Sequence, residues 1–330
     1  MLVTLPAARI RRVATLICLL LGAALALAAC SGGGRIGGRT STSTAGNSSS
    51  VAQAKSNPST TTKPAGPTRP VHVSTLQSDN DTFGVGFAVV AQFDVAPATS
   101  QEFAKVAKIT VNDQPYDGAW FFQTSSNPAY KMEAIFRGQN YWPAHAKIHV
   151  DMPLKGVSAG TGLSFANNLT VDVATGPALI GTVDAQTSKL TLTRDGTQYV
   201  FPVALGAPTT PTMFGTKVMM DKHKKERMIG NSYDEIVDFS MRISSSGEYL
   251  HAAPWNIANI TSGRPSSNGC TNMLPTDAQK LYDLVEQGDV FQYPNAPGKQ
   301  MPSWDGFGWW NTPWPMFKAG GLLINHGTGD

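Results

Sequence analysis

Short runs of alternating or β-branched residues dominate the chain from residue 71 to about 175. Asn, Asp, Gly and Pro separate these runs, as turns between strands require. The predicted strands lie at 84–89, 108–111, 131–136, 147–150 and 168–173. Several short strands at this spacing predict a β-sandwich of about a hundred residues, immunoglobulin-like in size.

A second β-rich region begins near residue 178. Residues 189–193 and 198–201 alternate and flank Asp195-Gly196, a strong signal for a two-residue hairpin turn. The charged run 222–227 is predicted to be a solvated loop. Further strands are predicted around 217–220, 236–239 and 241–244.

One helix is well marked, at 277–287. Thr276 and Gln279 have the spacing of a capping box, and Gly288 stands where a C-terminal cap is expected. One face of this segment is apolar, through Ala278, Leu281, Tyr282 and Val285. A strand at 290–293 follows, and the tail after it is rich in Trp, Gly and Pro. We expect this tail to pack as a compact extension.

The first thirty residues are predicted to lie outside the folded domains. Arginines at 9, 11 and 12 precede an apolar run at 13–29, which ends directly before Cys30. This is the layout of a secretory signal. Seventeen apolar residues could also just span a bilayer, so an uncleaved signal anchor is the alternative.

Removal of this signal changes the charge balance. It takes three of the 26 basic residues and none of the 23 acidic ones, which leaves 23 of each. The basic surplus therefore belongs to the targeting segment, and we expect no nucleic-acid partner. Residues 30–70 are rich in Ser, Thr, Gly and Pro and cannot bury enough apolar surface to fold, so they are predicted to be a flexible linker.

Cys270 is the one free thiol expected in the mature chain, because Cys18 lies in the signal and Cys30, directly after it, is expected to carry lipid. A lone thiol in an exported protein is either buried and inert or reactive. His251 lies nineteen residues before it, and an imidazole can take a thiol proton and return it to a leaving amine. Gly269 permits a tight turn that could aim backbone amides at an oxyanion. The residue types alone do not decide whether the Cys270 thiol is buried and inert or reactive.

The sequence around these residues resembles the signature of L,D-transpeptidases. In that family a histidine and a spacer of about fifteen residues precede Ser/Thr-His-Gly-Cys, with Asn or Arg two positions after the cysteine. Here fifteen residues, 252–266, separate His251 from Ser267-Asn268-Gly269-Cys270-Thr271-Asn272. The segment 277–289 and the Trp-rich tail are also similar to family members that carry an immunoglobulin-like domain.

The resemblance implies a peptidoglycan L,D-transpeptidase with Cys270 as nucleophile and His251 as base, oriented by the Ala252 carbonyl. The thiolate would attack a donor tetrapeptide, release D-Ala and pass the acyl group to a neighbouring stem peptide as a 3→3 cross-link. Carbapenems are the expected covalent inhibitors. No metal or organic cofactor is implied, and His223 is not expected to be a metal ligand because no second ligand stands at a suitable spacing.

Six further residues are expected at the site. Ser267, Asn268 and Gly269 are expected to shape it or its oxyanion hole, while Asn272, Trp255 and Tyr233 are expected to bind substrate. For Trp255, packing in the core is the alternative.

Asn268 departs from the family, which has histidine there. Asparagine keeps hydrogen bonding but cannot carry charge near neutral pH. The alternatives to transpeptidation are therefore a weakened or inactive wall-binding lipoprotein and an L,D-carboxypeptidase.

Leu27-Ala28-Ala29-Cys30 resembles a bacterial lipoprotein box. It implies diacylation of Cys30 and anchoring to the outer face of the cytoplasmic membrane, facing the cell wall. The predicted fold is mainly β, with one main helix in the catalytic domain. The predicted layout is a signal at 1–29, a linker at 30–70, an immunoglobulin-like domain at 71–175, a catalytic domain at 176–295 and a Trp-rich extension packed on it at 296–330.

Overall fold

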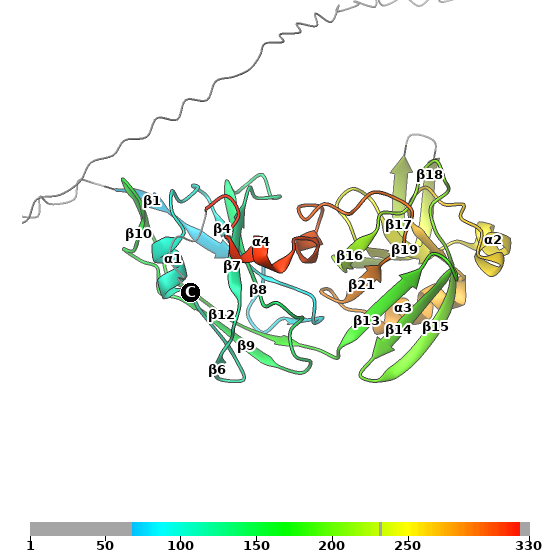
Figure 1. The fold of residues 1–330 in the computed structure, drawn as a ribbon, viewed down its shortest axis with the longest axis horizontal. Helices are drawn as coiled ribbons and strands as arrows, with labels where there is room; N and C mark the ends of the chain where they lie inside the picture. Colours follow the sequence, from blue (N-terminus) through cyan, green and yellow to red (C-terminus); the bar gives the residue numbers. More distant parts are fainter. Residues whose placement is uncertain (1–67, 231–232, 324–330) are drawn as a thin grey trace, which may run out of the picture. The chain divides into compact units, whose positions relative to one another are not determined.

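The computed structural model describes residues 68–230 and 233–323. The predicted signal, Cys30 and nearly all of the predicted linker lie outside these residues. Strands dominate the described part, so the expected mainly β fold is confirmed (Figure 1). No helix within the described residues is long and apolar enough to cross a membrane.

The immunoglobulin-like part consists of two main sheets and a small third one within the described residues. The first sheet has the order β3-β12-β9-β5-β6: β3 (Thr82–Phe83), β12 (Leu169–Thr175), β9 (Lys147–Met152), β5 (Lys108–Val111) and β6 (Gln114–Pro115). The second has the order β2-β4-β8-β7: β2 (Val73–Thr75), β4 (Val89–Phe93), β8 (Met132–Arg137) and β7 (Ala119–Gln123). The third pairs β1 (Arg69–Val71) with β11 (Leu163–Phe165), and β11 with β10 (Ser158–Gly160).

An aromatic core fills this part. Phe93, Phe103 and Phe165 have ring centroids within 6 Å of one another, and all three side chains are fully or almost fully buried. Phe103 comes from α1 (Gln101–Val106), a short helix that the strand pattern did not predict. Burial of aromatic surface is the main stabilising contribution expected here.

The strand predicted at 84–89 is wrong for most of its length. Only Val89 belongs to a strand, because the amides of Gly84 and Gly86 donate instead to the carbonyls of Gln287 and Gly288, at 2.7 and 2.8 Å. A Cβ on Gly84 would lie 2.2 Å from Asp289 Oδ1. Glycine therefore permits a backbone contact between two segments about two hundred residues apart in the chain.

The catalytic part is built on a sheet with the order β16-β21-β13-β14-β15-β20-β19-β18-β17 within the described residues. The first five strands are β16 (Gly215–Val218), β21 (Val290–Tyr293), β13 (Leu179–Asp184), β14 (Lys189–Arg194) and β15 (Thr197–Ala204). The other four are β20 (Thr271–Met273), β19 (Tyr249–Ala252), β18 (Tyr233–Arg242) and β17 (Asp221–Gly230). The hairpin predicted at Asp195-Gly196 is confirmed, with both residues at positive φ as a type I′ turn requires.

The charged run 222–227 is not a loop but the middle of β17, so that prediction is wrong. It pairs with β18 in a long hairpin, which also replaces the two separate strands predicted at 236–239 and 241–244. Two of its charges pair with carboxylates of β18, since Lys225 pairs with Asp238 and Arg227 with Asp234. An exposed ladder of this kind lacks the apolar alternation that marks a half-buried strand.

The predicted helix begins earlier and ends earlier than expected, as α3 (Pro275–Leu284). Leu274 is the N-cap and no side chain caps the helix, so the capping box of Thr276 and Gln279 does not form. Gly288 lies beyond the helix, where its φ of 94° serves the turn before β21. A second helix, α2 (Ile257–Ser262), follows the 3₁₀ turn η1 (Pro254–Asn256) and was not predicted.

The Trp-rich extension contacts both parts of the described chain, whereas packing on the catalytic domain alone was expected. Its 3₁₀ turn η2 (Gly308–Asn311) contacts β16, but α4 (Trp314–Lys318) packs beside β7, as Figure 1 shows. Arg137, at the end of β8, provides the reason. Its buried guanidinium lies 4.1 Å from the ring centroid of Phe317 and 4.5 Å from that of Trp310, and it donates to the carbonyl of Thr312.

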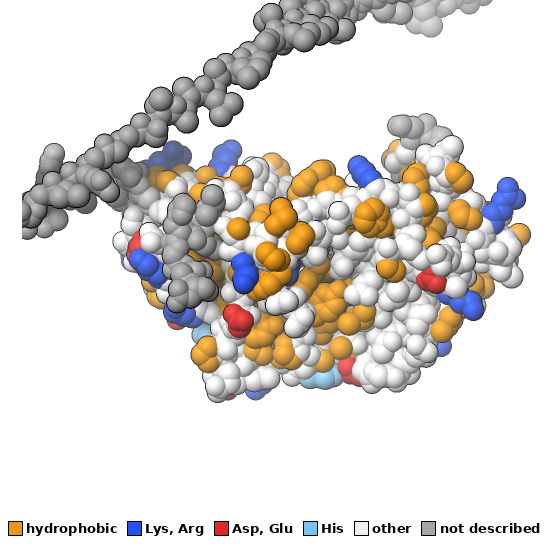
Figure 2. Space-filling view, viewed as in Figure 1, with side chains coloured by type: hydrophobic (Ala, Val, Ile, Leu, Met, Phe, Trp, Pro, Cys, Tyr) orange, Lys and Arg blue, Asp and Glu red, His pale blue; other side chains and the backbone are white. Residues whose placement is uncertain are grey.

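Charged side chains are dispersed on one face of the described part. On the face drawn in Figure 2, Lys and Arg side chains are scattered among apolar and uncharged ones without forming an extended basic patch on that face. This distribution agrees with the balanced charge of the chain after its first 29 residues.

Candidate active site

Cys270 and His251 line one shallow cleft of about 100 Å³ in the catalytic part. His251 lies in β19, and Cys270 directly precedes β20, the parallel neighbour of β19. Because the pairing sets His251 opposite Asn272, the side chains at 270, 272 and 251 share one face of the sheet. The other lining residues are Met228, Tyr233, Glu235, Val237, Trp255, Ser266, Ser267 and Asn268.

A tight turn places Cys270 in the cleft. Gly269 has a φ of 114°, which L residues rarely adopt, so the glycine expected before the cysteine is required by the backbone. Ser267 Oγ donates to the carbonyl of Cys270 at 2.5 Å and accepts from the amide of Gly269 at 3.2 Å. Since this amide is engaged within the turn, Gly269 and Ser267 shape the site, and the Gly269 amide is not available as an oxyanion donor.

The histidine is held as a base. His251 Nδ1 lies 2.9 Å from the carbonyl of Ala252, as the resemblance implied. A carbonyl can only accept, so Nδ1 carries the proton and Nε2 keeps its lone pair. Burial lowers the pKa of His251, and the Ala252 carbonyl and Glu226 oppose this effect. The imidazole is therefore neutral near pH 7 and able to take a proton.

The thiol is protonated in the resting site. Burial raises the pKa of Cys270 to about 11, while the backbone N–H of Tyr249, which faces the sulfur, lowers it. Sγ also lies 3.8 Å from the carbonyl of Gly247. Both groups of the pair are thus neutral in the described site, so a reaction of Cys270 as a thiolate would require a base to take its proton.

This protonation state predicts a steep pH dependence of simple alkylation. With Cys18 and Cys30 replaced by serine, iodoacetamide can modify Cys270 alone. With a pKa of about 11, only on the order of one thiol in ten thousand is ionised at pH 7. The alkylation rate should rise about tenfold per pH unit from about pH 7 to about pH 10. A rate that levels off below about pH 8 would show a preformed thiolate instead.

The predicted substrate-binding residues all line the cleft. Trp255 is 55% exposed and its ring lies 6.1 Å from that of His251, so it does not pack in the core. Asn272 is 4% exposed, and its Oδ1 has no hydrogen-bond partner among the residues that the structure describes. Tyr233 lies near the nucleophile, since Cys270 contributes to raising its pKa after the larger effect of burial.

The β17–β18 hairpin supplies one wall of the cleft. Tyr233, Glu235 and Val237 alternate along β18 and line the cleft together with Met228 of β17. Of these four, only Tyr233 was expected from the sequence. The alternation of 233, 235 and 237 is the available signal, but it extends across the boundary of the separate strand predicted at 236–239 and therefore does not mark a wall of the cleft by itself.

Asn268 lies exposed at the rim of the cleft, next to the turn that presents Cys270. The residue expected to depart from the resembled signature therefore lies on the exposed edge of the cleft.

One potential metal-binding group was missed. Ligand atoms of Asp221, His223 and Glu226 lie within 4.8 Å of one another, although no second ligand was expected near His223. Strand alternation would place residues 221 and 226 on opposite sides, so spacing along β17 did not predict this group. Glu226 is already bonded to Ser240, so the group is a weak ligand set.

Comparisons with known proteins agree with this geometry. Residues 180–294 match the family described as the L,D-transpeptidase catalytic domain (YkuD), and residues 37–158 match a bacterial Ig domain. The chain carries an L,D-transpeptidase catalytic domain. It is 30% identical over 265 residues to L,D-transpeptidase 2 of Mycobacterium tuberculosis, which covers 76% of this chain and 63% of that protein. It is 31% identical over 163 residues to L,D-transpeptidase 1 of the same species, covering 46% and 59%.

Solved L,D-transpeptidase structures share the fold. An L,D-transpeptidase in complex with imipenem has a TM-score of 0.56 and 25% identity, covering 69% of this chain and all of that one. An L,D-transpeptidase from Mycobacterium smegmatis has the same TM-score at 23% identity, covering 69% of this chain and all of that one. The chain thus spans less than two thirds of the length of the curated relatives but the full length of these solved chains.

Proposed function

We propose that this L,D-transpeptidase domain forms 3→3 cross-links in peptidoglycan through an acyl-enzyme on Cys270. The observation that supports this most is the shared cleft, in which a neutral thiol lines the same wall as a histidine whose Nε2 is free to accept a proton. The names of the relatives support the same reaction class.

The reaction has two steps. As Sγ of Cys270 attacks the carbonyl between the third residue of the donor stem and its terminal D-Ala, His251 Nε2 takes the thiol proton. The carbon–nitrogen bond then breaks, the proton passes to the leaving amine, and D-Ala departs. A side-chain amine of a second stem attacks the thioester, gives a proton to His251 and restores the Cys270 thiol.

Two groups in the cleft fit a peptide substrate. Asn272 Oδ1 is buried without a partner among the described residues, and a buried unpaired carbonyl costs about 1–3 kcal/mol, which an amide N–H of a bound stem would recover. The exposed indole of Trp255 offers an apolar surface beside His251. Carbapenems would acylate the same thiol and act as inhibitors.

A transfer assay tests the proposal. Purified protein is incubated with a disaccharide-tetrapeptide, and the products are analysed by mass spectrometry. A dimer that has lost one D-Ala and carries a 3→3 bond is expected. Release of D-Ala with tripeptide alone would identify an L,D-carboxypeptidase, and absence of D-Ala release would contradict both reactions.

The second candidate is a weakened enzyme that acts mainly as a wall-binding lipoprotein. Asn268 favours it, because an exposed amide at the rim replaces a group that can carry charge. Replacing Asn268 by histidine tests the candidate through the rate of acylation by a carbapenem. An increase of tenfold or more would support an impaired site, whereas an unchanged rate would reject it.

We further propose export and lipid anchoring through Cys30, on the outer face of the cytoplasmic membrane. The support is the sequence pattern alone, since Cys30 lies outside the described residues. A Cys30→Ser variant should be released from the membrane fraction after signal cleavage. Retention of the cleaved variant with membranes would contradict the anchor.

A further inference from the structure

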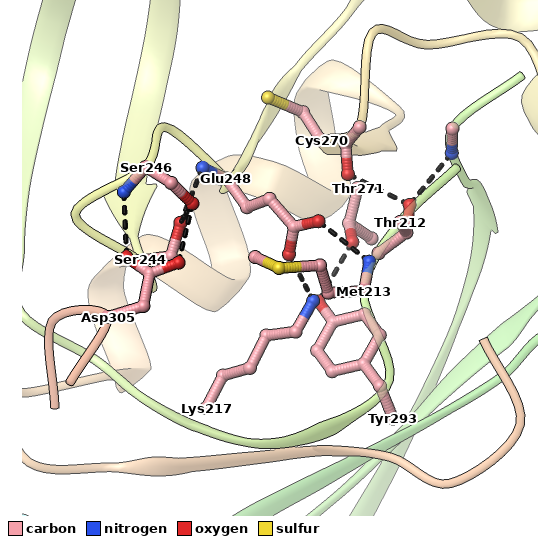
Figure 3. A network of polar contacts seen from close by, with 12 residues as sticks. Thr212, Met213, Lys217, Ser244, Ser246, Glu248, Cys270, Thr271, Tyr293 and Asp305 are labelled. Atoms are coloured by element: carbon pink, nitrogen blue, oxygen red, sulfur yellow. Dashed lines mark hydrogen bonds and ion pairs between the residues drawn. The ribbon is translucent and has the colours of Figure 1, made fainter. Parts of the chain in front are cut away.

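A buried ion pair lies beneath the nucleophile and has no part in the two steps above. Lys217 of β16 is fully buried and pairs with the carboxylate of Glu248, which is 7% exposed. The Lys217 ammonium also lies 3.8 Å from the ring centroid of Tyr293. Figure 3 shows this network, with Cys270 above it.

The pair is tied to the residues on both sides of Cys270. On one side, Glu248 Oε1 accepts from the amide of Met213, and Thr212 donates its hydroxyl to the carbonyl of Gly269, each at 2.8 Å. On the other side, the hydroxyl of Tyr293 lies 2.8 Å from Thr271 Oγ1. The residue before the nucleophile and the residue after it are therefore linked to one charged centre.

Glu248 also sits within the segment that contacts the sulfur. Its neighbours Gly247 and Tyr249 supply the carbonyl and the N–H that face Sγ. The amide of Glu248 donates to Ser244 Oγ at 2.8 Å, and this hydrogen bond holds the segment in place. Glu248 and its two neighbours thus connect the groups around Sγ to the turn at Gly269, which precedes Cys270.

We propose that Lys217 and Glu248 form a positioning pair, which holds Cys270 in line for acyl transfer and keeps the charge beneath it balanced. The inference rests on the proposed acyl-enzyme chemistry. Replacing a buried ion pair by apolar residues is often neutral or stabilising, so stability alone does not explain the use of one here. The position of the pair between Gly269 and Thr271, the residues before and after the nucleophile, does explain it.

The charges around the sulfur define what the pair must balance. Besides Lys217 and Glu248 themselves, the described titratable groups near Cys270 or this ion pair come from several elements. They are Glu226, Tyr233, His251, Tyr293 and Asp305. Glu248 raises the pKa of Cys270 and Lys217 lowers it, both less than burial does. Without Lys217, the Glu248 carboxylate would stand alone beside a thiolate as it forms.

The test compares Lys217→Met with the double variant Lys217→Met/Glu248→Gln in the Cys18→Ser/Cys30→Ser full chain. In the single variant the rate of Cys270 alkylation at pH 9 should fall by about tenfold, because a lone carboxylate opposes the thiolate. In the double variant this rate should return to the parent value. Equal rates in the single and double variants would overturn the charge-balancing role.

The double variant also tests positioning, and it leaves no unpaired buried charge that could prevent folding. Its acylation by a carbapenem should slow by about tenfold or more while its alkylation by iodoacetamide stays unchanged, because only the larger reagent requires an aligned sulfur. Acylation at the parent rate would overturn the positioning role.

A matched control separates positioning from general destabilisation. Leu190→Ala removes a fully buried side chain from the core of the same domain, and it should lower the melting temperature without changing either rate. If the parent chain itself is not acylated by carbapenems, the proposed function fails, whereas the alkylation rates at pH 9 still decide whether the pair balances charge.

Discussion

Replacing His251 by alanine is expected to slow acylation of Cys270 by a carbapenem about a thousandfold at pH 7. The reason is the protonation state of the pair. With a pKa of about 11, Cys270 is almost entirely a thiol at this pH, and His251, which lines the same cleft, keeps a lone pair on Nε2 that can accept its proton. Single-turnover mass spectrometry over minutes to days measures the rate.

The same variant has a diagnostic pH dependence. Its rate should approach that of the parent between about pH 8 and about pH 10, because hydroxide then ionises the thiol without a base. His223→Ala is the control, since His223 is an exposed histidine of β17 that does not line the cleft. A His251→Ala rate within threefold of the parent at pH 7 would contradict the assignment of the base.

Replacing Gly206 by alanine is expected to destabilise the catalytic part by about 3 kcal/mol and to abolish most acylation. A Cβ at this position would lie 2.1 Å from the carbonyl oxygen of Thr210 and 2.7 Å from the amide of Thr212. Both atoms belong to backbone, so the loop itself must move. That loop supports the nucleophile turn, because Gly206 bridges to Ser267 and Thr212 bonds to the Gly269 carbonyl.

Chemical denaturation and carbapenem acylation measure the two effects of Gly206→Ala. Gly176→Ala is the matched control, because its added Cβ would meet nothing closer than 3.7 Å. It should unfold and react like the parent. A Gly206→Ala protein with parental stability and rate would show that the close packing beneath Ser267 and Gly269 is not needed.

Features set by local chemistry could be predicted from the sequence. The type I′ turn at Asp195-Gly196 and the positive φ of Gly269 follow from residues that adopt these conformations without strain. The pairing of His251 with the Ala252 carbonyl also involves neighbouring residues, and the family resemblance implied it.

Features set by tertiary contacts could not be predicted. Lys225 and Arg227 of β17 pair with carboxylates of β18, and the whole run pairs with β18 in a ladder, so a charged run that looks like a loop forms a strand. Gly84 and Gly86 pair with a segment near residue 288, which turns a predicted strand into an irregular contact. Lys217 and Glu248 are 31 residues apart with no periodicity to connect them, and only the fold brings them together.

The helix α3 illustrates a middle case. Its apolar face was correctly predicted, and Ala278 and Leu281 are buried. The ends of α3 were not correctly predicted. Leu274 and Val285 adopt extended backbone conformations that join the helix to neighbouring segments, so the helix does not end at the cap residues expected from the sequence.

The central claim is that Cys270 is an acylatable nucleophile, and intact mass after incubation with a carbapenem tests it most directly. The parent protein and a Cys270→Ala variant are incubated side by side and measured over hours. We predict a stoichiometric adduct on the parent and none on the variant. An unmodified parent, or an adduct that persists in Cys270→Ala, would contradict the account.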